Sequence, residues 1–255
     1  MCDNILKNIT VSIVSHNHGK LIPNLLEQLS HFSKHLGKVI VTYNVLENLR
    51  IKTQGYPFEV CVIDNDKPKG FGANHNRAFE LCSTEYFCVM NPDIFLDLDP
   101  FSQLLFCHKD KNISVTAPLV LDLKGSIENS ARKFPTFFTL AGKALGIYND
   151  IYKIGGNKSI IKPDWLAGMF LLIRSDVYSN LSGFDESFFL YYEDVDFCTR
   201  AWKNGFDVAL CTNIFIKHDA RRESHRNIKF LKWHIVSAIR YLIKYQGRLP
   251  LKTRG

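Results

Sequence analysis

The chain has 255 residues, 46% of them hydrophobic and 22% charged, which suits one large soluble domain with a sizeable core. Its longest uninterrupted apolar stretch, residues 166–173, is far shorter than the roughly 20 residues that a membrane-spanning helix needs. No positively charged and then apolar leader opens the sequence, so we expect a cytoplasmic protein that is neither secreted nor membrane-spanning.

The net charge of +7 is distributed unevenly along the chain. Residues 221–255 contain ten Lys or Arg against one acid, a charge of +9, which leaves −2 for residues 1–220. We therefore expect a main domain at 1–220 and a basic C-terminal helical extension at 221–255 packed on it. Such a segment binds nucleic acid or an anionic membrane, or is only a solvated helix face. Because the charge is confined to one terminal helix without a recognition motif, we expect no nucleic-acid partner.

Seven cysteines are scattered along the chain, an odd number with no C-x-x-C pair. Most of them sit inside apolar runs, such as 58–63 and 85–90. This pattern predicts buried, reduced thiols rather than a disulfide framework or a zinc site. The positions are Cys2, Cys61, Cys82, Cys88, Cys107, Cys198 and Cys211.

Short apolar runs alternate with segments of helical periodicity from residue 10 to residue 120. This alternation predicts an α/β fold with a mostly parallel central sheet and helices on both faces. Strands are expected at 10–15, 39–45, 58–64, 86–91 and 114–120, and helices at 21–32, 73–82 and 100–107.

The pattern becomes less regular after residue 120. Residues 124–163 lack clear periodicity, which predicts a loop-rich insertion over one end of the sheet. Regular patterns then return and predict strands at 165–174, 208–211 and 214–217, with helices from 175 and at 194–204.

The last predicted helix, 225–245, is amphipathic. Its basic residues lie on or beside one flank, so we expect it to attach the protein peripherally to an anionic membrane surface. The apolar stripe of this helix is formed by Ile228, Leu231, Ile235, Ile239 and Leu242.

Polar clusters follow four of the predicted parallel strands at equivalent places. In an open parallel sheet, ligands bind beyond the carboxyl ends of the strands, so these clusters predict a ligand site at that edge. The clusters are Ser15-His16-Asn17, then Asn44 with Glu47, then Asp64-Asn65, and finally Asn91-Pro92-Asp93.

A glycine-rich segment, Gly70-Phe71-Gly72, precedes the second predicted helix. Free backbone N–H groups and the helix dipole at such a start favour an anion or a polar ring, although a plain glycine-rich turn has the same pattern. The segment is not G-x-G-x-x-G, because position 75 is His, and it follows the third strand, so a dinucleotide-binding loop is disfavoured.

Two further residues predict metal or diphosphate chemistry. Asp93 follows a buried strand, where a carboxylate can hold Mg²⁺ or Mn²⁺ and through it a diphosphate, or can simply cap the next helix. His218 ends a predicted strand beside Asp219, Arg221, Arg222 and His225, and is a candidate metal ligand or diphosphate donor; the alternative is a structural histidine.

An aromatic run, 184–192, ends abruptly in three acids at 193, 194 and 196. Burial raises the pKa of a carboxylate and a helix N-terminus lowers it, so Glu193 or Asp194 could serve as a poised general base. A capping cluster is the alternative. Trp165 beside Gly168 suits a platform on which a sugar ring stacks, or a core tryptophan.

Together these segments resemble the family 2 glycosyltransferases with the GT-A fold. Residues 11–17 (VSIVSHN) are similar to the opening strand of that family, and Gly70-Phe71-Gly72 with Asn76 resembles its nucleotide-side loop. Asn91-Pro92-Asp93 resembles a variant of its D-x-D metal motif, and residues 193–196 (EDVD) with Arg200 resemble its catalytic motif. Residues 132–135 (RKFP) and the basic stretch 233–241 resemble O-antigen rhamnosyltransferases that use dTDP-L-rhamnose.

The resemblance implies a role for each matched residue. Asp194 would be the base and Glu193 its partner, while Asp93 and His218 would hold Mg²⁺ or Mn²⁺ on the donor diphosphate. The nucleotide sugar would be lined by Ser15, His16, Asn17, Asn44, Glu47, Asn65, Gly70, Gly72, Asn76 and Asn91. The acceptor would be bound by Trp165, Gly168, Arg132 and Tyr192.

Two departures from the family pattern change these expectations. Tyr43-Asn44 stands where the family often has Asp-Asn, so recognition of the base would run through Asn44 or Glu47. The metal motif has one carboxylate instead of two, which predicts weak metal binding or a partial dependence on metal.

The implied function is an inverting glycosyltransferase that moves L-rhamnose from dTDP-L-rhamnose to a saccharide on polyprenyl diphosphate. The site of action would be the inner face of the bacterial cytoplasmic membrane, in the assembly of O-antigen or another surface polysaccharide. One alternative keeps the fold and mechanism but uses a UDP-hexose donor. Another is an inactive nucleotide-sugar-binding scaffold, which the presence of Asp93, Glu193, Asp194 and His218 disfavours.

Overall fold

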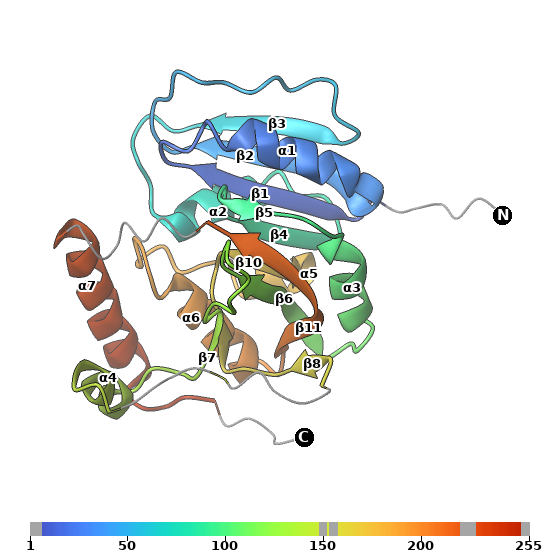
Figure 1. Ribbon diagram of the computed structural model, residues 1–255. Coiled ribbons are helices and arrows are strands. Elements are labelled where there is room, and N and C mark those ends of the chain that lie inside the picture. Colours follow the sequence, from blue (N-terminus) through green and yellow to red (C-terminus); the bar gives the residue numbers. More distant parts are fainter. Residues whose placement is uncertain (1–6, 148–151, 153–157, 220–227, 251–255) are drawn as a thin grey trace.

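The computed structural model describes residues 7–147, 152, 158–219 and 228–250 (Figure 1). Within these ranges the chain forms a nine-stranded sheet flanked by helices, and a small two-stranded sheet of β7 and β9. The large sheet has the order β3-β2-β1-β4-β10-β6-β11-β5, with β8 paired to β11. Cys2, Arg221, Arg222 and His225 lie outside the described residues.

The elements span the following residues. The strands are β1 (Ile9–Ser15), β2 (Leu36–Tyr43), β3 (Glu59–Asp64), β4 (Tyr86–Met90), β5 (Ile94–Phe95), β6 (Ile113–Leu121), β7 (Ala131–Arg132), β8 (Ile160–Ile161), β9 (Trp165–Leu166), β10 (Phe170–Arg174) and β11 (Asp207–His218). The helices are α1 (Ile22–His31), the short 3-10 helix η1 (Ser33–His35), α2 (Phe71–Phe79), α3 (Pro100–Cys107), α4 (Phe137–Ala144), α5 (Ser175–Asn180), α6 (Glu193–Lys203) and α7 (Ile228–Tyr245).

The sheet is mostly parallel, as the sequence predicts. Strands β3, β2, β1 and β4 are all parallel, and β6 is parallel to β11. The exception at the centre is β10, which pairs antiparallel with both β4 and β6. One core cluster packs α1 and α3 on one face of the sheet, and a second packs α2, α5 and α6 on the other. The predicted α/β architecture is therefore confirmed.

The register of the parallel strands brings their carboxyl ends to one edge. Ser15 pairs with Tyr43, and Tyr43 pairs with Asp64, so β1, β2 and β3 end level with one another. On the other side of β1, Ile13 pairs with Met90, the last residue of β4. The segments that follow these strands consequently begin side by side, which gathers the polar clusters that the sequence places there.

A second long-range pairing adds to this edge. Strand β5 lies antiparallel to the end of β11, with Ile94 opposite His218. Asp93 is the residue before β5, and its carbonyl oxygen accepts a hydrogen bond of 3.0 Å from the backbone N–H of Asp219. Strand β11 is one continuous strand with a register shift between Cys211 and Phe215, which corrects the expectation of two separate short strands at 208–211 and 214–217. A bulge of this kind interrupts the apolar pattern without ending the strand.

The region predicted to be a loop-rich insertion contains short elements. Strand β7 and helix α4 lie within it, and β8 follows near its end. Helix α4 begins with a capping box, in which Thr136 and Thr139 exchange hydrogen bonds between side chain and backbone. Thr139 stands where a Glu or Gln usually completes such a box, which is why the sequence pattern did not reveal this helix.

Helix α7 contacts the rest of the protein through a different face from the predicted stripe. Tyr241 and Tyr245 are buried in a cluster with Phe134, Phe188 and Tyr192, and Ser237, one turn earlier, is buried as well. The predicted stripe residues Leu231, Ile235 and Ile239 are instead exposed. The tyrosine rings pack because their hydroxyls find partners: Tyr241 bonds Thr199 at 2.8 Å and Tyr245 bonds Asp196 at 2.7 Å.

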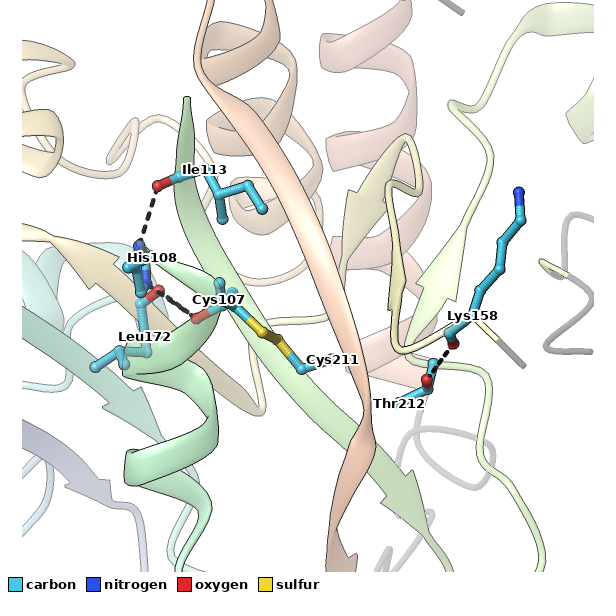
Figure 2. Close-up of a disulfide and its surroundings, with 8 residues drawn as sticks. Cys107, His108, Ile113, Lys158, Leu172, Cys211 and Thr212 are labelled. Carbon is cyan, nitrogen blue, oxygen red and sulfur yellow. Dashed lines mark hydrogen bonds between the residues drawn. A yellow bond between two sulfur atoms is a disulfide. The ribbon is translucent and has the colours of Figure 1, made fainter. Parts of the chain in front are cut away.

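The expectation that all cysteines are reduced is wrong at two positions. The sulfur of Cys107, at the end of α3, is bonded to that of Cys211 in β11 (Figure 2). The packing of α3 against β11 brings these buried side chains together across 104 residues of sequence, a distance over which no local pattern could reveal the pair. Cys61, Cys82, Cys88 and Cys198 are free among the described residues.

Candidate active site

The loop after β1 is held by a single carboxylate. Glu47 Oε1 accepts hydrogen bonds from Ser15 Oγ at 2.6 Å and from the backbone N–H of Asn17 at 3.0 Å, while Oε2 accepts from the N–H of Gly19 at 2.7 Å. Asn17 has a φ of 64°, a left-handed conformation that asparagine tolerates well. Glu47 thus shapes the loop that carries Ser15, His16 and Asn17, and both of its oxygens are occupied in doing so.

Next to this loop, side-chain amides form a connected network. Asn44 Oδ1 accepts from Asn65 Nδ2 at 2.9 Å and from the backbone N–H of Lys69 at 2.8 Å. Asn65 Nδ2 also donates to the fully buried Asn74 at 2.6 Å, and Arg77 donates to Asn65 Oδ1 at 2.8 Å. Asn44 further contacts His16 Nδ1 at 3.2 Å. Three of the predicted donor-site residues, His16, Asn44 and Asn65, therefore lie together.

Gly70 and Gly72 are explained by close backbone approach. A Cβ on Gly70 would lie 2.6 Å from the carbonyl oxygen of Phe189, and a Cβ on Gly72 would lie 2.7 Å from the Cβ of Phe184. The N–H of Phe71 donates to that same Phe189 oxygen at 2.9 Å. The two glycines let the start of α2 lie directly against the segment that leads into Glu193 and Asp194.

The side chain of Asn76 bonds a different part of the protein from the other predicted donor-site residues. Its Oδ1 accepts from the hydroxyl of Tyr178 at 2.7 Å and from the N–H of Phe184 at 2.9 Å, and its Nδ2 donates to Glu186 at 3.0 Å. These contacts fasten α2 to the turn around Gly183. The structure therefore gives the Asn76 side chain partners that belong to the fold.

Asp93 and His218 face each other at the strand edge. Asp93 Oδ1 lies 3.3 Å from His218 Nε2, and the other ring nitrogen, Nδ1, lies 2.9 Å from Glu128 Oε2. Burial lowers the pKa of His218, but Asp93 and Glu128 outweigh this effect and raise the pKa to about 9. Without a bound cation the ring is therefore a protonated bridge between two carboxylates at neutral pH, and a metal that binds Nε2 would have to displace the proton there.

Glu128 is the residue at this site that the sequence did not reveal. It lies between β6 and β7, in a segment that was predicted as part of a loop, and no motif marks it. A carboxylate on one ring nitrogen of a histidine fixes the ring's orientation and directs the other nitrogen at a ligand. Here Glu128 directs Nε2 of His218 toward Asp93.

Asp194 is fixed by backbone hydrogen bonds at the first turn of α6. Its Oδ2 accepts from the N–H of Gly168 at 2.9 Å and its Oδ1 from the N–H of Val195 at 2.8 Å. Burial raises the pKa of Asp194, while these two hydrogen bonds and the positive charge of Arg132 oppose that rise. The result is a half-buried carboxylate held in one orientation beside a cation.

The predicted acceptor residues divide into two groups. Arg132 in β7 pairs with Trp165 in β9, and its guanidinium lies 5.4 Å from the Trp165 ring centre. Gly168 contacts Asp194 directly, and the charge of Arg132 opposes the rise that burial causes in the pKa of the Asp194 carboxyl. Tyr192 instead points into the protein interior, where its ring packs 5.6 Å from that of Tyr241.

The carboxyl group of Glu193 is buried with one of its oxygens unpartnered among the described residues. Its Oε2 accepts no hydrogen bond among the described residues. Burial raises the pKa of Glu193 well above its usual value, and the neighbouring charge of Asp194 raises it further. Buried carboxyl groups that lack a partner are costly for stability and are typical of functional sites.

Comparison with known proteins decides the family. A model of "Glycosyltransferase like family 2" matches residues 58–237. The chain belongs to the family 2 glycosyltransferases. Rhamnosyltransferase WbbL of Escherichia coli is 28% identical over 92% of this chain and 93% of its own length. An N-acetylglucosaminyl-diphospho-decaprenol L-rhamnosyltransferase of Mycobacterium tuberculosis is 29% identical over 60% of the chain and 56% of its own length.

Solved structures confirm the GT-A fold of this glycosyltransferase. GalNAc-T7 with UDP, GalNAc and Mn²⁺ superposes with a TM-score of 0.66 at 15% identity, over 85% of this chain and 44% of that one. The mannosyltransferase PcManGT of Pyrobaculum calidifontis, with GDP-Man and Mn²⁺, superposes with a TM-score of 0.63 at 13% identity, over 93% of this chain and 64% of that one. Both neighbours contain a divalent cation.

The residues at the strand edge fit such a cation. Asp93 Oδ1 is buried and accepts no well-formed hydrogen bond among the described residues, although His218 Nε2 lies within ion-pair distance. A carboxylate oxygen and an imidazole nitrogen are ligands that Mn²⁺ accepts. No group of three His, Cys, Asp or Glu side chains within the described ranges forms a metal site by itself. A cation here would need ligands from the donor.

Glu193→Gln should stabilise the glycosyltransferase most at high pH. A carboxyl whose pKa is raised by folding favours the folded state fully only below its unfolded pKa, and this contribution is lost as the pH rises through the folded value. The neutral amide removes the pH-dependent penalty. We expect the melting temperature of Glu193→Gln to exceed that of the wild type at pH 8 and to approach it at pH 5, with about 2–4 °C for each kcal/mol recovered.

Thermal unfolding of both proteins across this pH range measures the effect. Asp194→Asn is the comparison, because the carboxylate that it removes has two hydrogen bonds in the wild type. A melting-temperature difference for Glu193→Gln that does not change with pH would contradict the raised pKa.

Proposed function

We propose that this glycosyltransferase transfers L-rhamnose from dTDP-L-rhamnose to a lipid-linked saccharide, with inversion at the anomeric carbon. The observation that carries the choice of sugar is the nearly full-length likeness to Rhamnosyltransferase WbbL. The mycobacterial relative is named for rhamnosyl transfer to a GlcNAc-diphospho-decaprenol, and another relative, from Salmonella typhimurium, is named an O-antigen chain rhamnosyltransferase. These names support a polyprenyl-diphosphate acceptor and a role in surface polysaccharide assembly.

Asp194 is the general base in this proposal. An acceptor hydroxyl donates its proton to Asp194 while its oxygen attacks the anomeric carbon, and the bond to the diphosphate breaks on the opposite face. One general base suffices for such a single displacement. Gly168 holds the carboxylate in place, and Arg132 favours the charged form that is able to accept the proton.

Glu193 is a buried neighbour of the proposed base, Asp194. Its buried side chain lies against Gly72, whose added Cβ would be 3.8 Å from the Cβ of Glu193. A neutral Glu193 avoids placing a second negative charge beside Asp194. The raised pKa of Glu193 is consistent with this neutral form.

The nucleotide-sugar donor would bind at the carboxyl ends of the parallel strands. Asp93 and His218 would hold Mg²⁺ or Mn²⁺ on the donor diphosphate, with Glu128 orienting the His218 ring and Asn91 close by. When bound, the cation supplies charge that stabilises the leaving nucleoside diphosphate. The loop at Ser15–Asn17 and the amides of Asn44 and Asn65 would line the nucleotide, and Gly70 and Gly72 would position the start of α2 beside it.

The acceptor side would be formed by Trp165 and Arg132 around Asp194. A tryptophan face suits the apolar face of a sugar ring, and a guanidinium suits a diphosphate. For a lipid-linked acceptor we place the protein at the inner face of the cytoplasmic membrane. In the part of the chain that the structure describes, no helix is both long and apolar enough to cross a bilayer.

The donor assignment is tested by thermal stabilisation with a panel of nucleotide sugars, with and without Mn²⁺. A ligand at about 100 times its dissociation constant adds about 2.7 kcal/mol to the stability of the folded state. We expect dTDP-L-rhamnose and dTDP to raise the melting temperature, more so with Mn²⁺. Stabilisation by UDP-hexoses alone would keep the mechanism and replace the donor, and stabilisation by no nucleotide would favour an inactive scaffold.

Asp194→Asn should lower kcat by about 10²–10⁴-fold, the usual contribution of a positioned base. The amide keeps the shape of the side chain, so the response to dTDP should be retained. The melting temperature should fall, because the amide nitrogen cannot accept one of the two backbone hydrogen bonds of Asp194. Initial rates of sugar transfer to a synthetic lipid-linked acceptor measure the loss. An active Asp194→Asn enzyme would remove Asp194 from the role of base.

Glu128→Ala should weaken Mn²⁺ binding in the presence of dTDP by about 10–100-fold, the usual effect of removing a carboxylate behind a histidine ligand. Glu128→Gln still accepts a hydrogen bond from Nδ1 and should lose less. Calorimetric Mn²⁺ titrations provide the measurement. In a His218→Ala background Glu128→Ala should add nothing, and an additive loss there would show that Glu128 does not act through His218.

A further inference from the structure

The outer face of α7 is an exposed apolar surface. Leu231, Ile235, Ile239 and Ile243 follow one another at intervals of four, so they form one row along the helix, and all four are exposed. Val236 is exposed beside them. The contacts of α7 with the protein are made by the separate row of Ser237, Tyr241 and Tyr245, so this apolar row has no partner among the described residues.

Helix α4 extends this surface. Phe137 and Phe138 begin the helix and are 70% and 84% exposed, and Leu145 and Ile147 follow its end equally uncovered. Phe134, three residues before α4, is buried in the same cluster as Tyr241 and Tyr245. This contact places the start of α4 beside the C-terminal half of α7, as Figure 1 shows at the lower left of the molecule. We call these outer faces of α4 and α7 the apolar platform.

Cations border the apolar platform, and no acid lies within its two segments. Residues 137–147 and 228–250 contain no Asp or Glu. Lys232 and Arg240 are exposed on α7, Lys143 is exposed in the last turn of α4, and Arg248 follows α7. Apolar side chains with a basic border are the signature of a helix that lies in the interface of an anionic bilayer.

The inner face of α7 holds the segment that leads to the catalytic acids. Ser237 Oγ donates to the carbonyl oxygen of Leu190 at 2.9 Å, and the His234 ring lies 5.3 Å from Tyr191. Trp233 packs 5.0 Å from Phe189. A surface that binds the outer face of α7 is thereby one helix diameter, about 10 Å, from the turn that precedes Glu193.

We propose that the apolar platform docks on an anionic membrane surface and inserts Phe137, Phe138 and the exposed row of α7 into the lipid interface. A second copy of the chain fits this face less well. A two-fold symmetric contact would bring the cations around each platform against those of its partner, and the two segments of the partner contain no Asp or Glu that could offset the repulsion. This inference rests on the proposed function only in what docking would achieve, which is to bring Asp194 to a lipid-linked acceptor.

The test is co-sedimentation with vesicles, without nucleotide sugar or acceptor, so that its outcome is independent of glycosyl transfer. We expect binding to vesicles of equal phosphatidylglycerol and phosphatidylcholine, and little binding to phosphatidylcholine alone. Phe137→Ser with Phe138→Ser should weaken binding at least about tenfold through lost apolar burial. Lys232→Gln with Arg240→Gln should weaken it by about fivefold for each charge removed.

The matched control is Leu98→Ser with Phe106→Ser. These side chains are 48% and 60% exposed, but they lie just before and within α3, on the other side of the molecule (Figure 1). The control should bind vesicles like the wild type, and all variants should keep the wild-type melting temperature and the stabilisation by dTDP. The proposal is overturned if the wild type ignores anionic vesicles or if the Phe137/Phe138 variant binds them as tightly as the control.

Light scattering of the same proteins separates a second copy from a membrane. A wild type that is dimeric, does not bind vesicles and becomes monomeric in the Phe137/Phe138 variant would assign the platform to self-association and overturn the proposal. Failure of vesicle binding with intact dTDP stabilisation would leave the glycosyltransferase function standing. Loss of dTDP stabilisation in the wild type would count against the function and not against the platform.

Discussion

The hydrogen bond from the backbone of Gly168 to Asp194 is the contact on which the arrangement of the site depends. It joins the turn between β9 and β10 to the first turn of α6, and it fixes the Asp194 carboxylate relative to the sheet. A Cβ at position 168 would meet both the Phe71 ring at 3.4 Å and the Cβ of Asp194 at 3.5 Å, so the three elements already touch. The close approach that glycine allows therefore holds the turn between β9 and β10, the start of α2 and the Asp194 carboxylate together, with one backbone N–H fixing the carboxylate.

The segment that precedes Glu193 and Asp194 carries backbone strain, which its contacts with helix α7 offset. Tyr191 and Tyr192 are consecutive non-glycine residues with φ of 69°, a conformation that costs about 1–2 kcal/mol for each residue. Both rings lie against His234, and Tyr192 also packs on Tyr241. Helix α7 therefore does more than cover the surface, because its contacts hold the backbone that aims Glu193 and Asp194.

Much of the fold could be predicted from sequence because its signals are local. The parallel strands end in polar residues, so Asn44, Asn65 and Asp93 could be grouped at one edge before any coordinates were known. Glu128 could not, since its role depends on a hydrogen bond across 90 residues to His218. The packing face of α7 could not be predicted because a search for apolar residues at helical spacing passes over Tyr241 and Tyr245, whose rings carry a polar hydroxyl. In the folded protein Thr199 and Asp196 bond these hydroxyls, so both rings can be buried. The disulfide between Cys107 and Cys211 was missed for the same long-range reason.

The exposed aliphatic row of α7 has a physical meaning of its own. An amphipathic helix in a soluble domain normally turns its aliphatic row inward, because burial of each such side chain contributes about 1.5–3 kcal/mol. Helix α7 forgoes that gain and packs through tyrosines, leaving Ile235, Ile239 and Ile243 outside. A helix with two usable faces can bind two things at once, and the inner face of α7 binds the turn that precedes Glu193. If the aliphatic face docks on a lipid surface, as we propose, the inward face cannot use the same side chains, and it packs instead through polar-tipped rings with specific partners.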